Sequence, residues 1–99
     1  MLHIINKSPF DQGTLDAGLR FTRKGAAVLL IEDGVYAATR GTAVSKQMEE
    51  ALKNVSIYAL VPDLEARGMQ NRVMDGVRLV DYGGFVDLVA EHNAVQSWL

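Results

Sequence analysis

The run from Ala26 to Ile31 restricts the possible folds of this chain more than any other feature. Val28, Leu29, Leu30 and Ile31 are consecutive apolar residues, so the segment would bury side chains on both of its faces. A strand with two buried faces is typical of the centre of a parallel sheet that is covered on both sides. The chain should therefore contain such a sheet.

Further short apolar segments alternate with segments of helical pattern. The apolar segments are Leu2 to Ile5, Ser56 to Val61 and Val77 to Val80. This alternation indicates βαβ units and a parallel sheet. A chain of 99 residues is long enough for one domain and too short for two. We therefore expect a single α/β domain over residues 1–99, with a mostly parallel sheet and helices on both of its faces.

Apolar periodicity and turn residues place the helices between these strands. The expected helical segments are Leu15 to Thr22 with a stop at Gly25, Asp33 to Thr39, Thr42 to Asn54, Asp63 to Arg67 with a stop at Gly68, and a last helix from Tyr82. In the last helix, Phe85, Leu88, Val89 and His92 would share one face. Residues Met69 to Gly76 read as a surface loop.

Composition excludes several classes of function. Ten basic residues against twelve acidic ones, without a dense basic run, disfavour independent nucleic-acid binding. No cysteine is present, which excludes disulfides, CxxC redox sites and thiolate metal sites. The longest apolar run is too short to cross a bilayer, and the first residues lack a signal-peptide pattern. We expect a cytoplasmic protein without membrane contact.

Polar, turn-forming segments follow the predicted strands, where parallel sheets commonly bind ligands. The candidate strand-end residues are Ser8, Asp33, Gly34, Asp63 and Asp81. A structural interpretation explains them almost as well, because Ser8 and the three aspartates precede helical patterns and could accept backbone N–H bonds as N-caps. The sequence has neither GxGxxG nor GxxxxGK[ST], and clustered carboxylates would repel a phosphate.

No catalytic, metal or cofactor-binding constellation emerges from the sequence. His3 lies in the first strand and His92 near the end of the last helix, and neither has a metal-ligand partner at a suitable spacing. Their expected roles are strand packing for His3 and a helix-dipole contact for His92. Ser8 lacks a nucleophile-elbow motif. We therefore expect neither an enzyme nor a cofactor.

The apolar C-terminal tail is the least ordinary part of the sequence. The chain ends in Trp98 and Leu99, where a terminus is usually polar. Two explanations stay open, packing onto the chain's own domain or docking at a subunit interface. The residues expected at a partner interface are Tyr36, Phe85, Val86, Trp98 and Leu99.

Several short motifs in order along the chain resemble the DsrH/TusB family. They are residues 6–10 (NKSPF), 30–38 (LIEDGVYAA), 63–68 (DLEARG), 80–88 (VDYGGFVDL) and 95–99 (VQSWL). Each is weak alone, but together they span the chain from end to end. The first and last of them look closer to the DsrH branch.

This resemblance implies a DsrE-like α/β fold and membership of a heterohexamer with DsrE/TusD-like and DsrF/TusC-like subunits. Such complexes relay persulfide sulfur, either toward 2-thiouridine at the tRNA wobble position or in cytoplasmic sulfur oxidation, which the DsrH-like motifs favour. The principal sulfur-carrying cysteine would reside on the DsrE/TusD-like partner. Some DsrH-like chains have a cysteine in the first helix, where this chain has Gly18. That departure implies a scaffolding role.

Two hypotheses follow. The first is a non-catalytic structural subunit whose isolated form self-associates or is poorly soluble. The second is an independent small-ligand-binding module that uses the strand-end crevice, with polar contacts from Lys7, Ser8, Asp33 and Asp81.

Overall fold

All neighbouring strands of the sheet run parallel, in the order β4-β3-β2-β1-β5. The structure is a computed structural model and describes residues 1–10 and 13–98. The strands are β1 (Leu2–Ile5), β2 (Ala27–Leu30), β3 (Ser56–Leu60), β4 (Arg78–Val80) and β5 (Val95–Trp98). The predicted α/β class, with its mostly parallel sheet, is confirmed.

The apolar run that dominates the sequence forms β2 at the centre of this sheet. Every residue of Ala27–Leu30 is buried. The strand pairs with β1 on one side and β3 on the other. Because both faces of β2 are covered, its side chains need no polar alternation.

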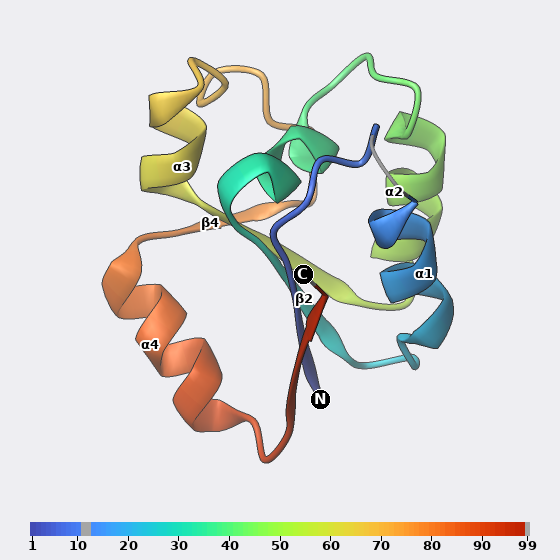
Figure 1. The fold of residues 1–99 in the computed structure, drawn as a ribbon, viewed down its shortest axis with the longest axis vertical. Coiled ribbons are helices and arrows are strands. Elements are labelled where there is room, and N and C mark those ends of the chain that lie inside the picture. Colours follow the sequence, from blue (N-terminus) through green and yellow to red (C-terminus); the bar gives the residue numbers. More distant parts are fainter. Residues whose placement is uncertain (11–12, 99) are drawn as a thin grey trace.

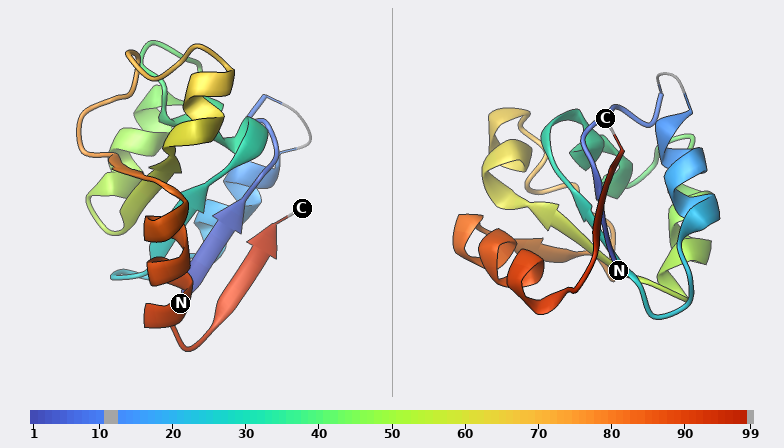
Figure 2. Two further views of the ribbon diagram at one scale, coloured as in Figure 1. Left: turned by 90° about the vertical axis from the view of Figure 1, so that its left-hand side faces the viewer. Right: turned by 60° about the horizontal axis from the view of Figure 1, so that its bottom comes forward.

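Helices cover both faces of the sheet, as predicted. The helical elements are α1 (Thr14–Phe21), the 3₁₀ helix η1 (Glu32–Ala38), α2 (Ser45–Leu52), α3 (Val61–Ala66) and α4 (Tyr82–Glu91). Figures 1 and 2 show α1 and α2 on one face and α4 on the other, with η1 and α3 near the carboxyl ends of the strands. No helix in the described part of the chain is long and apolar enough to span a membrane.

Two apolar cores fill the spaces between the sheet and these helices. The larger core lies on the α1 and α2 face and includes Ile5, Leu15, Val28, Leu30, Met48, Ile57 and Leu64. The smaller core lies under α4 and includes Leu2, Ile4, Ala27, Leu29 and Leu88. Alternate residues of β1 and β2 therefore serve opposite cores, as the two-residue period of a strand requires.

The C-terminal tail forms a fifth strand, which the sequence analysis did not predict. β5 pairs in parallel with β1, with Leu2 opposite Val95 and Ile5 opposite Trp98. Three of its four residues are exposed, because β5 is an edge strand. Short exposed edge strands lack the apolar run that marks a central strand, so the local sequence carries little signal for them.

Two other predictions need revision: the predicted stop of the first helix is wrong, and the predicted surface loop has one buried residue among mostly exposed ones. The first helix ends at Phe21, where Thr22 closes it by donating its hydroxyl to the Leu19 carbonyl over 2.7 Å; the stop was expected at Gly25. The connection Met69 to Gly76 is anchored, since Met74 is buried and its N–H donates to the Ala38 carbonyl over 2.8 Å. Met74 thus extends the larger core beneath the loop.

The close approach of η1 to the end of β1 depends on Gly34. A Cβ atom at this position would overlap the carbonyl oxygen of Ile5. That oxygen also accepts the Ile31 N–H over 3.0 Å, so it belongs to the hydrogen-bonded frame of the sheet and cannot move aside. The candidate strand-end residue Gly34 is therefore explained by backbone packing.

We predict that Gly34→Ala lowers the free energy of unfolding by roughly 2 to 3 kcal/mol, because the added methyl overpacks a fixed backbone contact. Urea denaturation followed by circular dichroism measures this loss. Gly83→Ala is the matched control, since its Cβ would approach only the exposed Asp81 carboxylate, at 3.3 Å. Equal stabilities of the two variants would contradict the packing role of Gly34.

Candidate functional site

The carboxyl ends of β2 and β3 carry a network of polar contacts. The Glu32 backbone N–H donates to the Asp63 carboxylate over 2.6 Å. Asp33 forms an ion pair with Arg67, with 2.9 Å between Oδ1 and both Nε and Nη2. The Asn6 side-chain amide, after β1, reaches the Glu32 carboxylate at 3.5 Å. Parallel pairing brings these strand ends together, as predicted.

The structure contradicts N-capping of their own helices by Asp33 and Asp63. Asp33 lies inside η1, whose N-cap is Ile31, and α3 begins at Val61 with Leu60 as its N-cap. Pro62 in the first turn lets that helix begin early, because proline needs no N–H partner there. The Asp63 carboxylate instead accepts the first N–H of the neighbouring η1, which a reading of single segments could not anticipate.

The other two strand-end residues have local roles. Asp81 is the N-cap of α4 and accepts the Gly84 N–H over 2.8 Å, which confirms the predicted cap. The Ser8 hydroxyl accepts the Phe10 N–H over 3.2 Å. It closes a turn well before α1, whose N-cap is Gly13. Neither contact connects Ser8 or Asp81 to the network around Asp63.

The strand-end network therefore holds secondary-structure elements together and offers little to a ligand. The Asp33, Asp63 and Asp81 carboxylates each accept an intramolecular hydrogen bond. Only the Asn6 Oδ1 atom is buried without a hydrogen-bond partner in the described structure. Within residues 1–10 and 13–98, no three His, Asp or Glu side chains are grouped closely enough to hold a metal ion.

The first and last strands contribute a side-chain pair that the sequence analysis missed. The Trp98 indole N–H donates to His3 Nδ1 over 3.1 Å, and the two rings stack with centroids 6.2 Å apart. An indole nitrogen can only donate, so His3 must accept at Nδ1. Its neutral form therefore carries the proton on Nε2. The two residues are 95 positions apart, and only the pairing of β1 with β5 brings them together.

The same contact favours the neutral form of His3. The side chain is buried, and burial lowers the pKa of His3 from its ordinary value of 6.5, with a smaller contribution from the positive amino terminus. Protonation would also place a hydrogen on Nδ1 and remove the acceptor for Trp98. The expected role of His3 as a packed strand residue is thus extended to a hydrogen bond between strands.

Two of the predicted interface residues make contacts within the chain. Trp98 packs against the larger core and Phe85 against the smaller one. Tyr36 is half-buried in η1, and Leu99 lies outside the described residues. Val86 is 64% exposed on α4, and this leaves it available to another molecule.

Val86 is one member of an exposed apolar stripe. Tyr82 is 63% exposed and Val89 is 37% exposed. Spacings of four and three residues place them with Val86 on one face of a helix. We call Tyr82, Val86 and Val89 the α4 stripe. The sequence analysis placed Val89 on the buried face, and the 3.6-residue period could have identified the stripe.

These features define a small all-parallel α/β domain with a structural polar network and one apolar helix face. The chain matches the family model described as "DsrH like protein" over residues 7–95. It is 39% identical to Protein TusB of Pectobacterium parmentieri and 35% identical to Protein TusB of Escherichia coli, in each case over 99% of this chain and all of the relative.

Solved structures share the fold. The ychN protein of Escherichia coli matches with a TM-score of 0.81 and 21% identity, over 97% of both chains. A protein of unknown function from Methanobacterium thermoautotrophicum, MTH1491, matches with a TM-score of 0.75 and 22% identity, over 97% of this chain and 95% of its own. The solved structures show the fold alone, whereas the family model and the TusB relatives show that the chain belongs to the DsrH/TusB family.

The His3 contact predicts a pH dependence of stability. A histidine whose pKa is lower in the folded chain binds fewer protons when folded, so stability falls as the pH drops from 6.5 through the folded pKa. Urea unfolding at a series of pH values from 7.5 downward measures this loss. His3→Gln keeps an acceptor without the titration, so its loss over the same interval should be smaller. An unchanged pH profile in His3→Gln would contradict the assignment.

Proposed function

We propose that this chain is a non-catalytic structural subunit of a DsrEFH/TusBCD-type sulfur-relay complex. It would assemble in the cytoplasm with DsrE/TusD-like and DsrF/TusC-like subunits as a heterohexamer, a dimer of heterotrimers. Persulfide transfer would take place on partner cysteines and serve tRNA wobble-uridine 2-thiolation or intracellular sulfur oxidation. The single observation that carries the proposal is the full-length match to TusB in a chain without cysteine.

The position of Gly18 supports a role without bound sulfur. The resemblance to the DsrH/TusB family implies that some DsrH-like chains have a cysteine at this position of the first helix. Here a Cβ atom at Gly18 would lie 3.0 Å from Ile5 Cδ1 and 3.7 Å from Trp98 Cδ1. Gly18 is itself buried. Trp98 and Ile5 therefore occupy the space beside this part of α1, and the chain has no thiol that could carry a persulfide there.

The α4 stripe is the surface best suited to partner contact. Its three side chains are apolar and exposed on one helix face, although the helix already buries Leu88 and half-buries Phe85 beneath it. A surface helix normally presents one apolar face and one polar face. An α-helix that is apolar on both faces needs a second neighbour, and a partner subunit would supply it.

The predicted partner residues keep different roles in this proposal. Val86 lies in the α4 stripe, and Phe85 would support the stripe from beneath. Trp98 and Leu99 are further proposed contacts at the C-terminal end, where Trp98 is the last residue of the edge strand β5. Tyr36, half-buried in η1, is a further proposed contact. Removing residues 94–99 would delete β5, so point substitutions on α4 test the interface more cleanly than truncation.

The contacts at the strand ends give no support to an independent ligand-binding module there. The carboxylates of Asp33 and Asp81, two of its expected polar contacts, are used within the chain by Arg67 and by the first turn of α4. A ligand would have to displace these bonds. The assembly proposal requires no such rearrangement.

Co-expression with DsrE-like and DsrF-like proteins of the same organism tests the proposal. We expect co-elution in size-exclusion chromatography with light scattering, at a mass near two copies of each subunit. Val86→Gln should weaken the assembly by about tenfold or more, because it places an amide in an apolar contact. Lys46→Gln, at an exposed site on α2 on the opposite face of the sheet, is the matched control.

A native chain that elutes alone in the presence of both partners would overturn the assembly proposal. Equal assembly of Val86→Gln and the native chain, with both folded by circular dichroism, would instead exclude the α4 stripe as the interface. The two results are distinguishable because the first concerns the native protein.

The pathway is tested in cells from which the gene is deleted. If the complex serves tRNA, nucleoside mass spectrometry should show loss of 2-thiouridine, and expression of the native chain should restore it. Unchanged 2-thiouridine would exclude the tRNA pathway and favour sulfur oxidation.

A further inference from the structure

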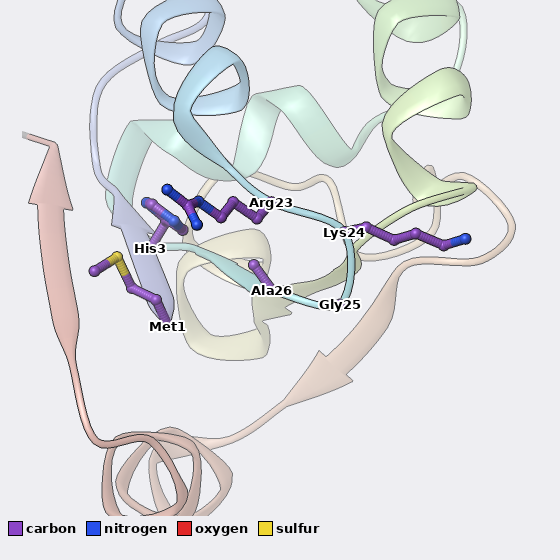
Figure 3. Close-up of a pocket in the computed structure, with 6 residues that line it drawn as sticks. All are labelled: Met1, His3, Arg23, Lys24, Gly25 and Ala26. Carbon is purple, nitrogen blue, oxygen red and sulfur yellow. The ribbon is translucent and has the colours of Figure 1, made fainter.

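A cavity of about 520 Å³ lies at the amino-terminal edge of the sheet, away from the strand-end network. It is lined by Met1, His3, Arg23, Lys24, Gly25 and Ala26. These residues come from the start of β1 and from the connection between α1 and β2 (Figure 3). The proposed function uses none of the groups in this cavity.

The charged groups around the cavity are all basic. Among the described residues, its lining includes Arg23 and Lys24 and contains no carboxylate, although the whole chain has a formal net charge of −2. In the described part of the chain, neither basic side chain has an ion pair or a hydrogen bond. Figure 3 shows the Arg23 side chain extending toward the His3 ring, whereas Lys24 points away. Arg23 is therefore the cation that faces the cavity.

His3 adds a fixed hydrogen-bond donor. Its Nδ1 accepts the Trp98 indole N–H, so the neutral ring carries its proton on Nε2. The ring is held in place by stacking on Trp98 and by burial. A donor whose orientation is already fixed loses little conformational freedom when a ligand binds. Met1 and Ala26 supply apolar surface beside it.

We propose that this cavity binds a phosphate-type oxyanion, through the Arg23 guanidinium and the His3 Nε2–H. A guanidinium offers paired N–H donors that match two oxygens of a phosphate. The Arg23 cation and one neutral donor at an open site, with the positive amino terminus near His3, imply weak binding, with a Kd on the order of 1 mM. The anion could be free phosphate or the phosphate group of a nucleotide, since both present the same oxygens.

Trp98 provides a built-in reporter, because it is the only tryptophan of the chain and contacts His3. The isolated full chain is titrated with inorganic phosphate at pH 7.5, with sodium chloride adjusted to hold the ionic strength constant. Trp98 fluorescence and the indole N–H signal in NMR are recorded together. A parallel titration with adenosine 5′-monophosphate separates the two sources: tighter binding indicates a nucleotide, and equal binding indicates that phosphate alone is recognised.

We expect a saturable change with phosphate, and at least a tenfold higher Kd in Arg23→Gln. Arg72→Gln is the matched control, because it removes the same charge from an exposed loop residue outside the cavity and should leave the Kd unchanged. Circular dichroism verifies that both variants are folded. Equal Kd values for Arg23→Gln and the native chain would overturn the proposal, as would a response to phosphate that never saturates or that chloride reproduces.

Discussion

The pairing of β1 with both β2 and the last strand, β5, is the constraint on which the rest of the structure depends. β1 lies between β2 and β5, and all four of its residues are buried. The start of β1 is also hydrogen-bonded on both sides, since the Leu2 N–H donates to the Ala94 carbonyl and the Met1 carbonyl accepts the Ala27 N–H. Both apolar cores use side chains of this strand. Loss of β1 would therefore remove the sheet register and both cores together.

The unequal covering of the two sheet faces accounts for the surface of the domain. One face carries α1 and α2, while α4 covers the other (Figure 2). α4 connects the edge strands β4 and β5, and in the described part of the chain it is the one helix that packs on the smaller core (Figure 1). Its outward residues therefore stay exposed, and the α4 stripe is the consequence. Such a surface fits a protein that is completed by other subunits.

The sequence predicted the central sheet well and the polar site less well, for one physical reason. A run of apolar residues such as Ala27–Leu30 indicates a buried strand by itself. The strands and their parallel arrangement could therefore be predicted from short stretches of sequence. Polar residues at strand ends report only that a turn or cap is near. Asp63 was expected to cap its own helix but bonds to Glu32, 31 residues away. The choice between these partners depends on how η1 and α3 pack.

By itself, the sequence determined the α/β class, the central position of β2, the absence of any thiol and the family. Each of these follows from residue types or from periodicity along the chain. Only the tertiary structure decided that the tail pairs with β1 and that Trp98 donates to His3. It also decided that Arg23 and His3 line one cavity. The partners in these contacts are far apart in the sequence, and hydrogen bonding between strands, rather than local propensity, brings them within reach.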